Sequence, residues 1–458
     1  MSNNNNNNNN NKELRPSLGY RLFKRYVRFL HNRLLYRHMY AVNKEAVPPI
    51  GTPVLIVSNH QNCANDPLAL LLSLEIDTHP YVIARGDVFA WNQKLASFFK
   101  WIGMLPAFRL HTEGAESLGK NEETIRISGG ELLKGQRLIM YPEGTHQDKR
   151  WLGEFSFGYT RMAFQTAEMN DFQTDILILP SCNHYSSYFG LQEDFMVKFG
   201  TPISLKPYYE LYKTKPRTAQ REVNKLVRAQ IEGMMLNITD LDNYDAIDTI
   251  RNTYGVTYAS NHGRNPNYLP DKLASDRDLF EAIEQAKAAD AETVQQIFDD
   301  ARALQQGLDQ QRLDNDRFDR KPSVVATCAQ SLAQIALLPV WLVALWPGIV
   351  CYNLPKLFLK TDKMFTNTLI LILNVLVFVP IFLSATFLVA GCGFGWWWQA
   401  AVWVLLFPAI TLFAWYDYKW MRRTVRDWRF LTHARCAKFT ALKNLRNRMY
   451  ANLNKVLH

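Results

Sequence analysis

Residues 53–72 read "PVLIVSNHQNCANDPLALLL", and this segment carries the strongest indication of the architecture. A short aliphatic run bounded by turn-forming residues is typical of a buried strand. Pro67 is favoured in the first turn of a helix, so a helix is predicted to begin near Asp66. His60 then lies in the loop between strand and helix. Two interpretations remain open: His60 and Asp66 form a catalytic pair, or Asp66 is a helix N-cap and His60 a loop residue.

The same alternation of strand and helix continues along the chain. Further strands are predicted at residues 80–84, 137–142 and 175–182, and helices at residues 115–135 and 218–236. Alternating strands and helices predict an α/β domain with a mixed central sheet, to which we assign residues 45–238.

The flanking regions differ from this domain in charge. Residues 1–18 contain an Asn run and are predicted to be a disordered leader; they lack the apolar core of a signal peptide. Residues 19–44 are predicted to form a basic amphipathic helix on a membrane surface. Residues 239–321 form an acidic helical insert, with seventeen Asp and Glu against nine Lys and Arg between 239 and 320.

The C-terminal part of the chain is predicted to be a membrane region followed by a basic tail. Residues 322–355, 369–390 and 396–416 are uncharged, and the last two can each cross a hydrocarbon core of about 30 Å. Residues 417–458 carry eleven Lys and Arg against two acids. The two basic ends indicate contact with anionic lipids rather than with nucleic acid.

A membrane topology follows from these segments. The domain and the tail 417–458 are predicted to face the cytoplasm, since basic segments stay on that side. Residues 322–355 would then form a re-entrant or interfacial helical hairpin, broken at Pro339 or Pro347, ahead of two spans within the membrane region 322–416. The predicted location is the inner membrane.

Several classes of site are disfavoured by the sequence. The six cysteines are scattered and form no metal-ligand pattern, so no metal or cofactor is expected. "GAESLGK" at residues 114–120 fits a phosphate-loop spacing, but Asn121 replaces the Ser or Thr that a metal needs. The chain has no GxSxG nucleophile elbow.

Polar residues follow the ends of several predicted strands. Arg85 follows "YVIA", Arg109 follows "MLPAF", and the run Glu143, Gly144 and Thr145 follows "RLIMYP". A fourth strand, "DILILPSC", is expected to end at its proline, Pro180. Ligands bind at the carboxyl ends of strands in α/β sheets, so these residues are candidates for one site with His60 and Asp66.

In this order and at these separations, the motifs resemble those of the glycerolipid acyltransferase family, which acylates glycerol 3-phosphate or 1-acylglycerol 3-phosphate. The resemblance covers about residues 45–240 and extends more weakly to bacterial members with a C-terminal membrane region. It implies that His60 is the general base and Asp66 its partner. It further implies that Arg109 holds the acceptor phosphate, that Glu143, Gly144 and Thr145 place the acceptor, and that Pro180 shapes the acyl pocket.

The sequence departs from the family pattern at two points. Five residues, rather than four, separate His60 from Asp66, and Asn65 occupies the usual position of the aspartate. We assign Asp66, because an asparagine has no negative charge to stabilise an imidazolium. His146 stands where the family often has arginine, and Lys149 and Arg150 are the candidates to replace that charge. Arg85 is a second candidate for the phosphate, with a surface ion pair as the alternative.

These observations predict a membrane-bound O-acyltransferase in phospholipid biosynthesis. A neutral His60 would take the proton of an acceptor hydroxyl as it attacks the thioester of acyl-CoA or acyl-carrier protein. Glycerol 3-phosphate is the predicted acceptor, and lysophosphatidate or another lysophospholipid is the alternative. A catalytically silent membrane adaptor and a transporter are the alternatives from other classes. Neither the oligomeric state nor the role of the acidic insert follows from the sequence.

Overall fold

The computed structural model describes residues 14–90, 92–107, 116–146, 149–353, 373 and 377–457. The predicted leader, residues 1–18, therefore lies outside the described residues as far as position 13. The chain divides into two compact units. The first comprises the described residues up to Met235, and the second begins at Leu236 and includes the C-terminus.

The first unit is built on a mixed, eight-stranded sheet. Its strand order is β1 (Tyr36–Val42), β7 (Glu193–Phe199), β6 (Leu177–Tyr185), β2 (Val54–Ser58), β5 (Arg137–Met140), β3 (Tyr81–Arg85) and β4 (Met104–Ala107), with β8 (Ile203–Ser204) beside β6. The strands from β6 to β4 run parallel, and β7 is antiparallel to β6. The predicted α/β class with a mixed sheet is confirmed.

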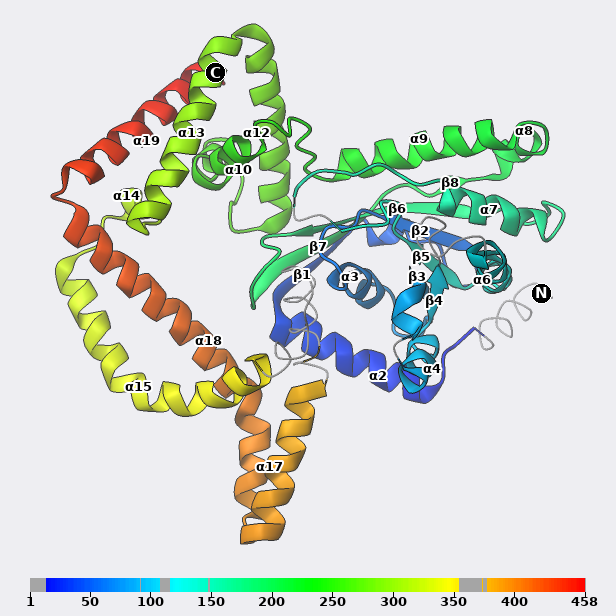
Figure 1. The fold of residues 1–458 in the computed structure, drawn as a ribbon, viewed down its shortest axis with the longest axis horizontal. Coiled ribbons are helices and arrows are strands. Elements are labelled where there is room, and N and C mark those ends of the chain that lie inside the picture. Colours follow the sequence, from blue (N-terminus) through cyan, green and yellow to red (C-terminus); the bar gives the residue numbers. More distant parts are fainter. Residues whose placement is uncertain are drawn as a thin grey trace. The chain divides into compact units, whose positions relative to one another are not determined.

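Helices cover both faces of this sheet. They are α2 (Leu18–Phe29), α3 (Asn65–Ser73), α4 (Gln93–Trp101), α6 (Glu116–Leu133), α7 (Gly158–Glu168), α8 (Tyr209–Thr214) and α9 (Pro216–Met234). Figure 1 shows α7 and α9 on one side of the sheet and α2 and α3 on the other. All five residues of β2 are buried, as expected for a central strand covered on both faces.

The N-terminal segment is only partly the helix predicted for residues 19–44. The helix α2 is followed by a short π-helix (Leu30–Leu35) and then by β1, which pairs in parallel with β7. Residues 36–42, "YRHMYAV", are rich in residues that favour strands, and their partner lies more than 150 residues away in the chain. The sheet thus begins before residue 45, the predicted start of the domain.

The helix α2 is amphipathic, but some of its basic residues face inward. Lys24 is buried, and its ammonium donates to the carbonyls of Glu75 at 2.7 Å and Thr78 at 3.0 Å. Burial lowers the pKa of Lys24 to about 7. Arg28 donates to the carbonyl of Leu74. These bonds attach α2 to the end of α3. The opposite face of α2 exposes an apolar stripe made of Leu18, Leu22, Tyr26 and Phe29.

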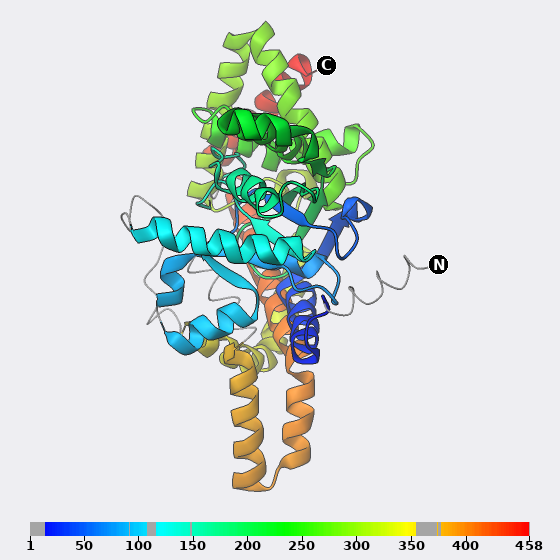
Figure 2. The same ribbon diagram turned by 90° about the vertical axis from the view of Figure 1, so that its right-hand side faces the viewer.

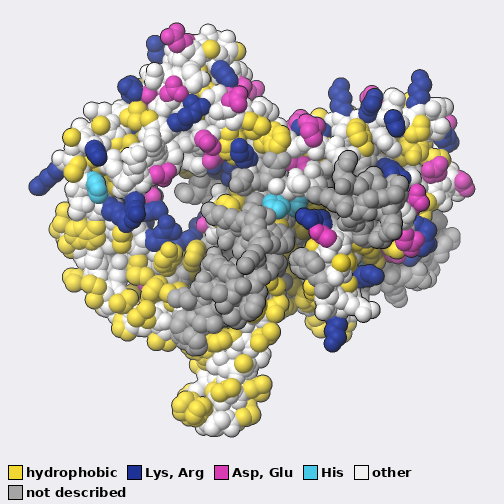
Figure 3. All heavy atoms as spheres, in the orientation of Figure 1, with side chains coloured by type: hydrophobic (Ala, Val, Ile, Leu, Met, Phe, Trp, Pro, Cys, Tyr) yellow, Lys and Arg dark blue, Asp and Glu magenta, His cyan; other side chains and the backbone are white. Residues whose placement is uncertain are grey.

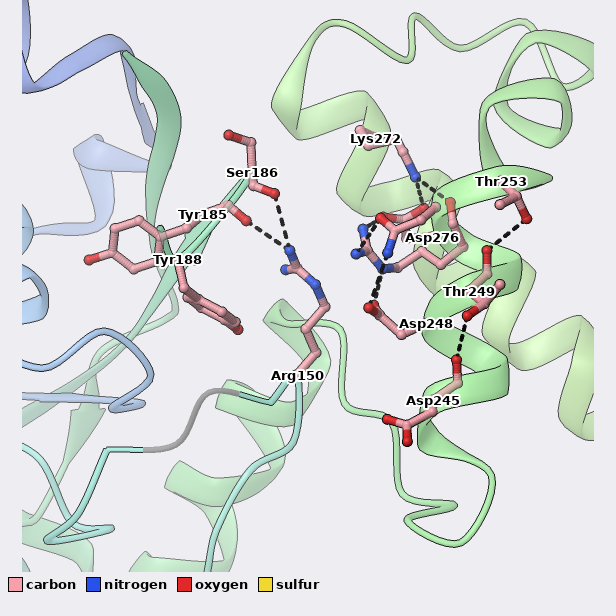
Figure 4. A network of polar contacts seen from close by, with 12 residues as sticks. Arg150, Tyr185, Ser186, Tyr188, Asp245, Asp248, Thr249, Thr253, Lys272 and Asp276 are labelled. Atoms are coloured by element: carbon pink, nitrogen blue, oxygen red, sulfur yellow. Dashed lines mark hydrogen bonds and ion pairs between the residues drawn. The ribbon is translucent and has the colours of Figure 1, made fainter. Parts of the chain in front are cut away.

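The second unit is helical, as predicted for the insert. The insert contributes α10 (Tyr244–Thr253), α11 (Gly255–Asn261), α12 (Leu269–Ala289), α13 (Ala291–Gln311) and α14 (Arg317–Arg320). The C-terminal region contributes α15 (Val324–Asn353), α17 (Val379–Phe394), α18 (Trp397–His433) and α19 (Ala437–Val456). Within the insert, Arg251, Asp248, Asp276 and Lys272 form a partly buried ionic cluster (Figure 4).

The predicted hairpin within residues 322–355 is wrong. Val324–Asn353 is one helix that passes through both Pro339 and Pro347, and Figure 1 shows it bent rather than folded back. A proline removes one backbone hydrogen bond and kinks a helix, but an otherwise strongly helical run can continue through it. The helix packs against α18 in antiparallel order: Gln334 bonds to Thr424 at 2.8 Å, and Trp341 donates to the Ala414 carbonyl at 3.0 Å.

The last two apolar segments meet in a helical hairpin. The turn lies at Gly395, whose φ of 70° is left-handed, and the ring of Trp397 packs directly on Gly391. Figures 1 and 2 both show α17 and the first part of α18 side by side, and Figure 3 shows apolar side chains gathered over them. Part of the predicted span 369–390 lies outside the described residues. In the described part of the chain, Val324–Leu345 and Trp397–His433 are long and apolar enough to cross a membrane.

The basic tail binds the acidic insert through ion pairs. Arg446 pairs with Asp319 at 2.6 Å, and Arg448 forms two hydrogen bonds to the buried carboxylate of Asp300, at 2.6 and 2.9 Å. The acidic insert therefore partly neutralises the basic tail, which the sequence assigned to a lipid surface. The tail also begins inside a helix, since α18 continues without a break across residue 417.

Candidate active site

Three neighbouring parallel strands bring the candidate residues to one edge of the sheet. β2 lies between β5 and β6, and the carboxyl ends of all three meet at this edge. His60 follows β2, Glu143 follows β5, and Tyr185 is the last residue of β6. This is the edge at which α/β sheets bind ligands.

His60 and Asp66 form a hydrogen-bonded pair. The Nδ1 atom of His60 lies 2.8 Å from Oδ2 of Asp66. The Asp66 side chain is fully buried, whereas the His60 side chain is 19% exposed. An ionised carboxylate only accepts hydrogen bonds, so Nδ1 is the donor in this contact, and in a neutral imidazole Nε2 then has the free lone pair. The pair therefore has one buried end and one end that a ligand can reach.

The Asp66 carboxylate organises the loop that holds His60. Its Oδ2 atom also accepts from the backbone amides of Gln61 at 2.7 Å and Asn62 at 2.8 Å. Its Oδ1 atom accepts from the hydroxyl of Tyr185 at 2.9 Å. Asp66 lies in the first turn of α3, where it does not cap the helix; the residue at the cap position is Ala64. The interpretation of Asp66 as an N-cap is therefore wrong.

The additional residue between His60 and Asp66 is absorbed by a turn. Cys63 has a φ of 44°, a left-handed conformation that is uncommon for cysteine, and the amide of Asn65 donates to the carbonyl of Asn62 at 2.9 Å. The turn directs Asp66, and not Asn65, towards His60. Asn65 is buried, and its Oδ1 atom has no hydrogen-bond partner among the described residues.

Glu143 contacts the backbone of the same loop. One carboxylate oxygen accepts from the amide of His60 at 2.6 Å, and the other accepts from the amide of Gly153 at 2.8 Å. Burial raises the pKa of Glu143 to about 7. Each oxygen thus fixes one loop of the site. The resemblance implied that this residue places the acceptor, but its contacts are those of a residue that positions His60.

Two aromatic rings lie beside His60. The centre of the Tyr141 ring lies 4.7 Å from the centre of the His60 ring, and the centre of the His146 ring lies 5.9 Å away in an edge-on arrangement. Burial raises the pKa of Tyr141 and of Tyr185 well above the usual value. Both phenols therefore remain protonated at neutral pH, and the hydroxyl of Tyr185 can donate to Asp66.

The other predicted residues are distributed unevenly around the site. Gly144 has a φ of 66° in the turn after β5, a conformation that glycine adopts without strain, and Thr145 is exposed beside it. Arg85 is exposed and forms a surface ion pair with Asp87, the alternative considered from the sequence. Arg109 lies outside the described residues, so its role as a phosphate ligand stays a prediction.

Pro180 does not end its strand, as the sequence suggested. β6 continues through it to Tyr185. Pro180 lies between Ile178, the last residue of β6 that pairs with β8, and Ser181, the first that pairs with β7. A proline without an amide hydrogen is tolerated in a strand where no partner needs that hydrogen. Pro180 is buried, and its carbonyl accepts from the amide of Gly200 at 2.8 Å.

Arg150 forms hydrogen bonds with backbone carbonyl groups. Its guanidinium is buried and donates to the carbonyls of Tyr185 at 3.0 Å and Ser186 at 3.4 Å, and it lies over the ring of Tyr188 (Figure 4). It therefore supports the end of β6, and its contacts are not those of a phosphate ligand. Lys149 is exposed.

Three residues of the site, Tyr185, Asn59 and Asn183, were not identified from the sequence. Tyr185 holds Asp66 across 119 positions of the chain, and Asn59 joins β2 to β6 through bonds to the carbonyl and amide of Asn183. The nearest hint was the run of polar residues "CNHY", 182–185, at the end of an apolar strand. The described residues contain no group of His, Cys, Asp and Glu that could hold a metal ion.

The arrangement suits proton abstraction by an imidazole. A neutral histidine whose Nδ1–H is held by a buried carboxylate can accept a proton at Nε2, and the carboxylate then stabilises the imidazolium. Among the described residues, no Ser or Cys side chain forms a hydrogen bond with His60, so an external hydroxyl can be the nucleophile.

Comparisons with known proteins agree with this chemistry. Residues 38–183 match the sequence profile of the family described as Acyltransferase. No curated protein matches the chain. Among solved structures, a 1-acyl-sn-glycerophosphate acyltransferase from Thermotoga maritima, PlsC, is similar over 44% of this chain and 79% of its own, with 15% identity and a TM-score of 0.30.

Proposed function

We propose that this chain, whose residues 38–183 match the Acyltransferase profile, transfers a fatty acyl group from a thioester donor to glycerol 3-phosphate. The observation that carries the proposal is the contact of 2.8 Å between a partly exposed His60 and a fully buried Asp66, at the carboxyl edge of the sheet. The intact hydrogen bond between His60 and Asp66 speaks against a catalytically silent adaptor.

In the proposed reaction, His60 acts as general base. Its Nε2 atom takes the proton of the glycerol hydroxyl as the oxygen attacks the carbonyl carbon of the thioester. A tetrahedral intermediate forms and collapses, the carbon–sulfur bond breaks, and the proton on His60 passes to the departing thiolate. The donor is acyl-CoA or acyl-carrier protein, and the products are lysophosphatidate and the free thiol.

The parts around His60 have separate roles in this reaction. Asp66 fixes the tautomer and stabilises the positive charge, Tyr185 holds the second oxygen of Asp66, and Glu143 fixes the backbone of His60. These contacts hold the base before substrate binds, and such preorganisation lowers the barrier. We assign the acceptor phosphate to Arg109, whose guanidinium would bind it bidentately.

A membrane location fits the acceptor chemistry. The product of the reaction is a lipid, and the exposed apolar stripe of α2 (Leu18, Leu22, Tyr26 and Phe29) belongs to the unit that carries the site. Two helices of the second unit are also apolar and long enough to span a bilayer. We propose that the domain works on the cytoplasmic surface of the inner membrane, where thioester donors are available.

The function is tested by acyl transfer in membranes that contain the full chain. Labelled acyl-CoA or acyl-carrier protein is supplied with glycerol 3-phosphate or with lysophosphatidate, in separate reactions. We expect transfer to glycerol 3-phosphate that is lost in His60→Ala. Transfer only to lysophosphatidate would replace the proposed acceptor with the alternative, and transfer that persists in His60→Ala would refute the general-base role.

A further inference from the structure

The second unit contains a large cavity that the proposed reaction does not use. Its volume is about 770 Å³, and its walls come from the end of α13, the loop that leads to α14, the basic part of α18, and Trp341 of α15. All of its lining residues belong to the second unit. The cavity is thus formed where the insert meets the two long apolar helices.

The charge of the cavity is positive. Four arginines line it, against the two carboxylates of Asp309 and Asp314. Arg426 pairs with Asp314, and Asp309 accepts from the amide of Gln305 at 3.0 Å. The three remaining arginines are Arg312, Arg422 and Arg429. Within the described part of the chain these three guanidinium groups form no ion pair. Figure 3 shows Lys and Arg side chains gathered over α18 near α14.

The other wall of the cavity is aromatic and apolar. Trp341 and Tyr418 line it, and the guanidinium of Arg422 lies 5.7 Å from the centre of the Tyr418 ring. Leu308 and Val425 add aliphatic surface. A site with arginines at one side and aromatic and aliphatic side chains at the other suits an amphiphile with an anionic head.

Arg422 is the cavity arginine of α18 that lies nearest to the surface of a bilayer. The uncharged segment of α18 ends at Tyr416, and at the rise of an α-helix Arg422 follows it by about 9 Å and Arg429 by about 20 Å. The head-group layer is about 5–8 Å thick on each side of the hydrocarbon core, so Arg422 lies at its outer boundary and Arg429 lies beyond it. The neighbouring apolar surface is open: Leu405 of α18 is 78% exposed and Val343 of α15 is 58% exposed.

We propose that this cavity binds the phosphate of an anionic glycerophospholipid, whose acyl chains lie along the exposed apolar side chains of α15 and α18. Arginines bind phosphate bidentately, and the aromatic residues suit the region between head group and hydrocarbon. The lipid would be a bound ligand of the second unit and not the acceptor of the acyl group. It would link the insert to the membrane helices at the level of the head groups.

The experiment is a lipid titration of the full chain in detergent, followed by native mass spectrometry. The probes are dioleoylphosphatidylglycerol, dioleoylphosphatidylcholine and, as a soluble competitor, inorganic phosphate. The test variant is Arg422→Gln with Arg429→Gln. The matched control is Arg423→Gln with Arg435→Gln, which removes the same charge from two exposed arginines that do not line the cavity. Binding is measured without turnover, so the result is independent of acyl transfer.

We expect the wild type and the control to prefer phosphatidylglycerol. The test variant should bind it about 25-fold more weakly, since each arginine that lines the cavity and reaches the phosphate contributes about a factor of five. Inorganic phosphate should compete only at far higher concentration. Equal weakening in the control, or no preference over phosphatidylcholine, would overturn the proposal. If inorganic phosphate displaced phosphatidylglycerol at a concentration equal to that of the lipid, the proposal that the ligand is a lipid would be overturned. If the double variant does not fold, Arg429→Gln alone provides the same comparison, with a fivefold effect.

Discussion

The substitution Glu143→Gln tests whether Glu143 positions His60 or binds the acceptor. The carboxylate accepts from two backbone amides, those of His60 and Gly153, at 2.6 and 2.8 Å. A glutamine has a single acceptor oxygen at the end of its side chain and can satisfy only one of them. The lost bond to a charged acceptor is worth about 1.5–3 kcal/mol.

The effect of this substitution on stability is offset by the removal of a buried charge. Burial raises the pKa of Glu143 from its ordinary 4.5 to about 7. The group's contribution to stability is therefore complete below pH 4.5 and is lost as the pH rises through 7, by about 3 kcal/mol in total. At pH 8 the substitution removes a buried negative charge, which increases stability, and this gain nearly cancels the loss of one hydrogen bond. We expect the free energy of unfolding to change by less than about 2 kcal/mol.

Catalysis should respond more strongly than stability. If the lost 1.5–3 kcal/mol appears in the transition state, kcat at pH 8 falls by about 10- to 100-fold, with little change in the KM of the acceptor. The difference in kcat between the wild type and the variant should narrow below pH 6, where Glu143 of the wild type is itself protonated. Kinetics between pH 5.5 and 9 and thermal unfolding measure both effects, and Glu154→Gln, an exposed change in the same loop, is the control. A raised acceptor KM with an unchanged kcat would refute the positioning role.

Substitutions at five further residues test the site. His60→Ala should lower kcat by about 10²–10⁴-fold in a folded chain, measured as acyl transfer alongside circular dichroism. Asp66→Asn should reduce transfer far more than Asn65→Ala, since only Asp66 contacts His60; the reverse order would show that the assignment is wrong. Tyr185→Phe should cost about 1.5–3 kcal/mol in unfolding free energy, because a buried carboxylate oxygen loses its donor, and an unchanged denaturation midpoint would contradict this. Arg109→Ala should raise the KM of the acceptor but not of the thioester, and lysine there should restore binding only in part.

Local features of the sequence sufficed for the central strands and for placing His60 and Asp66 at the end of one strand and the start of the next helix. Both residues belong to one strand–loop–helix unit, so the distance between them depends on a single short loop. The central strands were visible because full burial requires continuous apolar runs such as "VLIV" in β2.

Features that depend on distant partners could not be predicted in the same way. Tyr185 reaches Asp66, and Tyr36 pairs with Glu193, only because β6, β7 and β1 are adjacent in the sheet. The charge of the tail was visible, but whether it binds lipid or the acidic insert is a question of tertiary structure. Pro339 illustrates a different limit, since its local preference for a break is overridden in a long apolar helix.

The parallel strand β1 has a practical consequence for how this chain can be shortened. It covers one side of β7, so a chain that starts at residue 45 would leave the backbone amides and carbonyls of β7 unpaired. Such an edge, flanked by Phe195 and Val197, is a template for association with another molecule. Truncation at residue 45, the boundary that the sequence suggests, would therefore favour aggregation. A chain that begins at residue 14 would retain β1 as the edge strand that pairs with β7.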